Sequence, residues 1–239
     1  MVLLVSREVY ALKVRVKYSK HDYMKYIGHL DMMRYFQKAI RRAKLPIAYS
    51  EGFSPHMIMS FAAPLGIGLE SDAEYMDISL VDGASISSSD AIDALNKQMV
   101  DAVHILEFVQ LSETAQNSMS IVGSADYEIY LSQNIFTDDD IKRFLSRESI
   151  ISTREGKKGP VEYDMKTMIH KLELIDGHIF AKISQGSVAN LKPQALMTEL
   201  LEFCGCSDAK VVRIIRKEIY SQTGMRLSEY GVENFEPRI

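Results

Sequence analysis

Along this chain, segments in which apolar residues alternate with polar ones, as in strands, are interspersed with segments in which apolar residues recur at helical spacing. The order of these segments restricts the folds that the chain can adopt. From Leu12 to Tyr18, apolar residues alternate strictly with basic ones, which predicts a strand with one buried face. Apolar residues then recur at helical spacing over 29–44 until Pro46 ends the pattern. The same criteria predict short extended segments near 46–49 and 57–61, a strand at 74–81, a helix at 89–102 and a strand at 105–111. The first half therefore has the order β-α-β-β-α-β.

The second half repeats this order after a polar, aperiodic stretch at 112–120 that is typical of a linker. Thr137 precedes three aspartates, as at a helix N-terminus, and Asp176-Gly177 is a strong hairpin signal. Pro193 occupies the expected first position of a helix. The predicted elements are a strand at 121–132, a helix from Thr137, a strand at 149–155, hairpin strands at 171–175 and 178–183, a helix to about Cys204 and a strand at 210–220.

Two successive βαββαβ units predict an α+β protein made of two tandem ferredoxin-like domains with antiparallel sheets. The expected domains are 1–111 and 121–220, followed by a polar tail at 221–239. The two halves share the order of their elements, with no sequence identity between them. No apolar run approaches the roughly 20 residues that a membrane span needs, so we expect a cytoplasmic protein without a membrane partner.

The net charge of −4 conceals an uneven distribution of charged residues. Residues 1–60 contain 11 basic and four acidic side chains, a net charge of +7. This asymmetry indicates an anionic partner at one end of the molecule; alternatively, the two parts attract each other across a domain contact.

Two groups of basic residues are candidates for binding nucleic acid. Lys13, Arg15 and Lys17 point to the same side of the first strand, and an open basic sheet face is one on which RNA binds. Alternatively, Glu74 and Asp77 on the neighbouring strand neutralise some of these cations. The second group lies along one flank of the first helix, which is either a binding surface or merely solvated: Arg34, Lys38, Arg41 and Arg42.

Histidines and one carboxylate near the first helix are candidate catalytic residues. His29, Asp31 and His56 have the side chains that proton transfer requires, although Asp31 is equally explained by its place in the first turn of a helix. The loop around His56 also has the composition of a ligand-facing loop, with Tyr49, Gly52, Phe53, Pro55 and His56 as its candidate residues.

Few signals point to a cofactor or a metal. Cys204 and Cys206 are the only cysteines, too few to hold an iron–sulfur cluster and more typical of buried apolar residues. The sequence has no P-loop, GxGxxG, GxSxG or HExxH motif. We therefore expect neither a bound metal nor a cofactor.

Five segments of the first half together carry a family resemblance: 14–20, 28–34, 43–56, 60–65 and 74–77. On these residues the first half resembles the radical-SAM-associated (radical-SAM-linked) family of bacterial proteins of unknown function. The resemblance is dense over about residues 12–82 and looser over 120–220. Where that family has Ser and Gln, this chain has Gly28 and Glu51.

The resemblance implies a radical-SAM protein as partner, and this sequence lacks the three-cysteine motif of such enzymes. We therefore expect a non-catalytic accessory protein of a radical-SAM enzyme that binds or positions an RNA substrate. Two alternatives stay open: a stand-alone RNA-processing or RNA-modifying enzyme that uses His29, Asp31 and His56, and a protein–protein adaptor that binds no nucleic acid.

Overall fold

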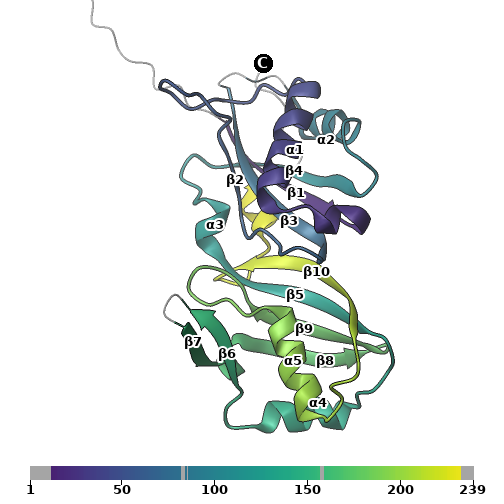
Figure 1. The fold of residues 1–239 in the computed structure, drawn as a ribbon. Coiled ribbons are helices and arrows are strands. Elements are labelled where there is room, and N and C mark those ends of the chain that lie inside the picture. Colours follow the sequence, from purple (N-terminus) through teal and green to yellow (C-terminus); the bar gives the residue numbers. More distant parts are fainter. Residues whose placement is uncertain (1–11, 82–83, 85, 157–158, 233–239) are drawn as a thin grey trace, which may run out of the picture.

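One curved β-sheet runs through the whole molecule (Figure 1). The computed structural model describes residues 12–81, 84, 86–156 and 159–232. The first half contains β1 (Leu12–Lys20), the 3-10 helix η1 (Asp22–Tyr26), α1 (His29–Arg42), β2 (Met59–Phe61), β3 (Glu70–Leu80), α2 (Ser88–Asn96) and β4 (Val103–Leu111). The second half contains α3 (Ser118–Ile121), β5 (Val122–Leu131), α4 (Asp138–Ser146), β6 (Ile151–Gly156), β7 (Gly159–Asp164), η2 (Lys166–Met168), β8 (Ile169–Ile175), β9 (His178–Ser184), α5 (Pro193–Phe203), β10 (Val211–Ser221), η3 (Leu227–Tyr230) and β11 (Gly231–Val232).

The sheet is mixed rather than antiparallel, which corrects the expected topology. Its strands follow the order β11-β4-β1-β3-β10-β5-β9-β8, and β2 pairs with β3. A short parallel contact joins the halves, with Ile215 and Arg216 of β10 beside Glu70 and Ser71 of β3. Strand β10 therefore forms hydrogen bonds at both edges, since its other edge pairs antiparallel with β5. The α+β class is confirmed, but the two expected sheets are one.

Each half has its own apolar core. In the first, Phe36 and Ile40 of α1 pack with Val16 of β1 and Phe108 of β4. The second core contains Phe144 of α4 and Leu196 and Leu200 of α5, together with residues of β5 and β9. Because Leu65 and Leu69 of the first half belong to this second core, the halves also share apolar contacts. None of the helices in the described ranges combines the length and apolar character needed to cross a bilayer.

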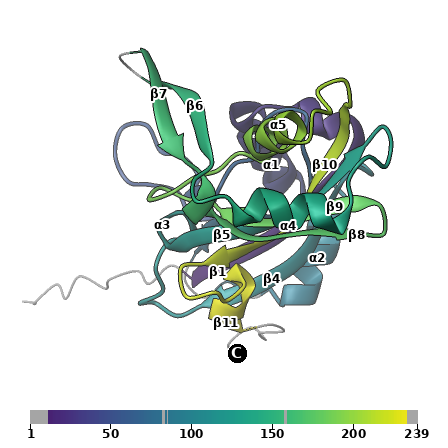
Figure 2. The ribbon, with the colours of Figure 1, turned by 90° about the horizontal axis from the view of Figure 1, so that it is seen from below.

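Several local predictions are confirmed because short-range geometry decides them. Thr137 begins α4 in a capping box with Asp140, and Pro193 is the first residue of α5. Asp176 and Gly177 adopt φ angles of 45° and 80° in the tight turn between β8 and β9. The expected strand at 149–155 forms half of a hairpin, β6–β7, which projects from the rest of the molecule in both views (Figures 1 and 2).

Residues 221–232 do not form the expected polar tail. Leu227 is fully buried, and Gly231 and Val232 pair with Leu111 and Gln110 at the edge of the first half. Figure 2 shows β11 beside β4. The chain therefore returns across the sheet face that the sequence pattern predicted to be open. The rest of the expected tail, 233–239, lies outside the described residues.

Candidate functional site

The basic side chains of β1 are not on an open face. Arg15 is fully buried, and its Nε and Nη2 donate to Asp77 at 2.8 and 3.1 Å. Its Nη1 donates to the Leu227 carbonyl at 2.9 Å. Asp77 also accepts a hydrogen bond from the Ser118 amide at 2.7 Å. Arg15 and Asp77 are register partners on neighbouring strands. Asp77 therefore neutralises Arg15, which was the alternative to an open basic face.

Lys17 is enclosed by acidic residues from both sides. Its Nζ lies 2.8 Å from Glu218 and 3.1 Å from Glu107, while the Tyr75 hydroxyl donates to Glu218 at 2.7 Å. Burial lowers the pKa of Lys17, but the hydrogen bond and charge of Glu218 outweigh it and raise that pKa overall. Lys13 differs, since its exposed ammonium donates to the Glu113 carbonyl at 2.7 Å. The expected binding face of Lys13, Arg15 and Lys17 is therefore largely an internal charge network.

The charge asymmetry of the chain does not translate into simple attraction between a basic and an acidic half. In two of the contacts across the junction the acid belongs to the first half: Glu70 with Arg213 at 2.6 Å, and Glu74 with Arg216. Burial disfavours ionisation of Glu70, yet hydrogen bonds from Arg213, Lys25 and His21 lower its pKa to about 2.

The basic flank of α1 is the group that stays exposed. Its members are Arg34, Lys38, Arg41 and Arg42. Arg34 pairs with Asp31 at 3.0 Å, and Arg42 donates to the Gln98 carbonyl at 2.9 Å. Within the described ranges, Lys38 and Arg41 have no ion pair. The helix buries Phe36, Ala39 and Ile40 against the sheet, and its amphipathic pattern therefore directs the cations outward.

The loop at 49–56 presents an aromatic ring to solvent. The Phe53 side chain is fully exposed and Tyr49 is half exposed. The loop is held at its base, where Ser50 Oγ contacts His56 Nδ1 at 2.8 Å and accepts from the His56 amide at 3.1 Å. Gly52 has a φ of 104°, a conformation that favours glycine. Sequence reasoning missed Ser50, because a serine in a turn gives no signal for its partner six residues later.

The three candidate catalytic residues have three different environments. The His29 ring packs edge-on against the Phe61 ring, with the ring centroids 5.1 Å apart. Asp31 forms an ion pair with Arg34, and His56 forms a hydrogen bond with Ser50. No interaction between any two of them is found in the described part of the chain. In that part, no group of three or more His, Cys, Asp or Glu residues is arranged to hold a metal.

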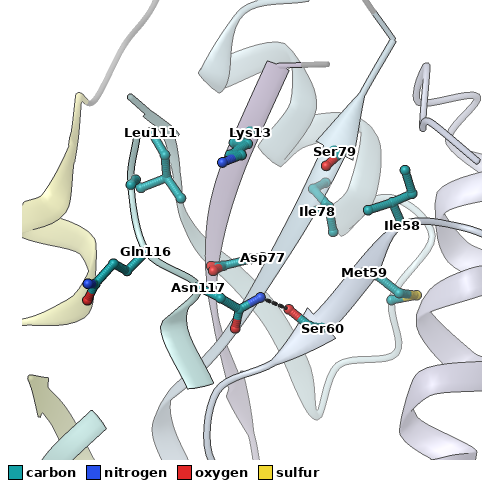
Figure 3. A pocket seen from close by; sticks show the side chains of 11 residues that line it. Lys13, Ile58, Met59, Ser60, Asp77, Ile78, Ser79, Leu111, Gln116 and Asn117 are labelled. Carbon is teal, nitrogen blue, oxygen red and sulfur yellow. Dashed lines mark hydrogen bonds between the residues drawn. The ribbon is translucent and has the colours of Figure 1, made fainter. Parts of the chain in front are cut away.

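The uncovered part of the sheet face contains a cavity of about 270 Å³ (Figure 3). Lys13, Asp77 and Ser79 contribute from the strands, and Asn117 closes one side by donating to Ser60 Oγ at 2.7 Å. The Asp77 carboxylate is already bound by Arg15 and Ser118, and Lys13 by a carbonyl. The polar groups of this cavity are thus mostly used within the chain.

Comparison with protein families finds a match over most of the chain. A family described as uncharacterized proteins conserved in bacteria (DUF2344) matches residues 13–193, most of the chain. The chain belongs to this family. The match begins within β1 and ends at the first residue of α5, so it includes strands from both halves of the sheet but not β10 or β11. No curated protein matches the chain.

Proposed function

We propose that this chain is an accessory protein that binds RNA through the basic flank of α1. The observation that carries the proposal is the exposure of Arg34, Lys38, Arg41 and Arg42 on one helix, where Asp31 is their only acidic ion-pair partner within the described residues. Surface helices usually mix charges of both signs. A row of cations matches the phosphates of a nucleic-acid backbone and gives binding that depends on salt.

The loop at 49–56 adds a second kind of contact. An exposed aromatic ring such as that of Phe53 stacks on unpaired bases, which single-stranded regions of RNA offer. An RNA with unpaired loops is therefore a better ligand for this surface than a continuous duplex. The proposed interface is therefore a helix and a loop of the first half, and not the β1 face, where Arg15 and Lys17 are paired with acidic residues inside the protein.

The partner in this proposal is a radical-SAM enzyme, as the family resemblance implies. The sequence has only Cys204 and Cys206, fewer than the cluster of such an enzyme requires. An accessory protein contributes by positioning a substrate, which lowers the activation free energy of the reaction by several kcal/mol. In this view the chain holds RNA, and its partner supplies the radical chemistry.

The proposal extends to the architecture. We infer that each half is a ferredoxin-like unit fused to its neighbour at the β10–β3 contact. The inference is supported by the two strand orders, β4-β1-β3-β2 and β10-β5-β9-β8, which place corresponding strands of the two βαββαβ units in corresponding positions.

Fluorescence anisotropy with labelled bulk tRNA at two salt concentrations tests the RNA proposal. The test variant is Lys38→Glu/Arg41→Glu, since neither side chain has a polar partner within the described ranges. The matched control is Lys142→Glu/Lys210→Glu, which makes the same charge change at exposed positions of the second half. We expect the test variant to bind about tenfold more weakly with a shallower salt dependence, and the control to bind nearly as wild type. Equal losses in both variants, or no binding by the wild type, would refute the proposal.

Affinity purification from the native host distinguishes the alternatives. RNA together with a radical-SAM protein in the eluate supports the proposal, whereas a protein without RNA supports the adaptor. His29→Ala and His56→Ala separate the enzyme from the accessory protein. Loss of turnover on bound RNA, with binding intact, would favour the enzyme.

A further inference from the structure

A second cavity, of about 530 Å³, lies where the two halves meet. One wall is apolar and comes from the first half, with Leu65, Ile67 and Leu69. Further lining residues come from β5, β10, the start of α5 and the segment before it, and they include Tyr127, Lys192, Gln194 and Arg216. The volume lies within the range of sites for small organic ligands.

Arg216 is the unusual residue among those that line this cavity. Its side chain is 1% exposed, and its Nη2 donates to the Ala63 carbonyl at 2.9 Å and to Glu74. The other two guanidinium nitrogens, Nε and Nη1, make no hydrogen bond of good geometry with the described residues, and the Tyr127 side chain adds only a weaker interaction with the guanidinium. Buried guanidinium donors are normally satisfied, so this position retains unused capacity to stabilise negative charge.

The buried charge around Arg216 is not balanced by acids. Lys20 is also almost fully buried, near enough to Glu74 and Arg216 for their charges to affect it. The Lys20 ammonium has no hydrogen bond or ion pair in the described part of the chain. Two buried cations therefore share one buried carboxylate, that of Glu74. Such an excess of positive charge in a region of low dielectric attracts an anion from the adjacent cavity.

The N-terminus of α5 points to the same kind of ligand. The helix has 11 residues, and its first turn has no side-chain cap within the described residues. Pro193 occupies its first position, so the free amides of the first turn begin at Gln194, which lines the cavity. Lys192, which also lines the cavity, adds an exposed cation. The dipole of the helix and the buried cations thus act on one cavity.

We propose that this junction cavity binds a small organic anion, with its phosphate or carboxylate between Arg216 and the start of α5 and its apolar part against Leu65, Ile67 and Leu69. Because Nε and Nη1 are themselves shielded from solvent, Arg216 acts through its charge rather than as an exposed clamp. This site is independent of the α1 flank and of RNA.

Isothermal titration calorimetry with three related probes tests the site. Phenyl phosphate and benzoate each carry an anionic group on an apolar ring, and benzyl alcohol is the neutral counterpart. We expect at least one of the two anions to bind saturably and benzyl alcohol to bind at least about tenfold more weakly. The tighter anion identifies the group as phosphate or carboxylate. No saturable binding of either anion, or equal binding of benzyl alcohol, would overturn the proposal.

Two variants of α5 locate the binding without disturbing the core. Gln194→Glu places a negative charge at the cavity in the first turn, where a carboxylate stabilises a helix, so the variant is expected to fold. Thr198→Glu makes the same charge change one turn later on an exposed face outside the cavity. We expect Gln194→Glu to weaken anion binding about tenfold and Thr198→Glu to leave it nearly unchanged. Equal affinities of the two variants would place the anion elsewhere and refute the site.

Discussion

Arg15 and Asp77 face each other across β1 and β3, and their pairing, 2.8 Å between Nε and Oδ1, turns an apparently open basic face into part of the interior. The same guanidinium reaches the Leu227 carbonyl, 212 residues along the chain. Arg15 thus links β1 to the segment 221–232, which covers it. The partners of this buried cation are the Asp77 carboxylate and the carbonyls of Leu227 and Gln116, so loss of the carboxylate charge has a definite expected cost.

Asp77→Asn is expected to destabilise the protein by about 3 kcal/mol, because it leaves the Arg15 charge buried without its counter-ion. Urea unfolding followed by circular dichroism measures the change. Asp31→Asn is the matched control, since it breaks an exposed ion pair and should cost less than about 1 kcal/mol. A loss for Asp77→Asn no larger than for the control would contradict the buried pair.

Glu70 predicts a pH dependence of folding. Its folded pKa of about 2 lies below the ordinary value of 4.5, so its contribution is complete above about pH 4.5 and disappears as the pH falls toward 2. Glu70→Gln should therefore lower stability at pH 7 by about 2 kcal/mol, as expected for charge-assisted hydrogen bonds, and by much less near pH 2. Unfolding curves at several pH values measure the difference. Glu202→Gln, at an exposed position without an ion pair in the described ranges, should show no such trend.

Leu227→Ala tests whether residues 221–232 belong to the folded core. The side chain is fully buried, so its truncation is expected to cost about 2–5 kcal/mol. Val232→Ala removes a mostly exposed side chain of the same segment and should change stability by less than about 0.5 kcal/mol. Equal, small effects on the urea midpoint would show that the segment is detached in solution.

Phe53→Ala tests the loop in the proposed RNA interface. Loss of one stacked base should weaken RNA binding by about 1–3 kcal/mol without changing the thermal midpoint, because the ring has no buried contacts to lose. Anisotropy with an unpaired oligoribonucleotide measures this effect. Val188→Ala removes another strongly exposed apolar side chain, from the segment between β9 and α5, and serves as control. Unchanged affinity in Phe53→Ala would remove the loop from the interface.

The sequence predicted the local elements well, and the reason is that short-range geometry encodes them. The alternation at Leu12–Tyr18, the cap at Thr137, the turn at Asp176-Gly177 and the start of α5 at Pro193 each involve residues within a few positions of one another. For the same reason, the amphipathic pattern of α1 placed its cations on the exposed flank before any tertiary contact was known.

The burial of individual charges was decided only by tertiary structure. Arg216 and Glu218 are two residues apart, which in a regular strand puts both on one face. The register of β10 shifts between them, so they pair opposite the adjacent residues Tyr127 and Asp126 and contribute to different networks. The alternation of apolar and polar residues along β10 does not reveal such a bulge. Two charged residues within an apolar strand do indicate that each needs a partner in the folded protein.

The sequence by itself determined the order and periods of the elements, because hydrophobic patterning, caps and turns are properties of neighbouring residues. Tertiary structure decided that the two halves share one sheet, that the C-terminal segment covers β1, and that Lys20, Glu74 and Arg216 are buried together beside a cavity. These outcomes depend on contacts between distant residues, where packing and desolvation select among arrangements that local patterns leave equally possible.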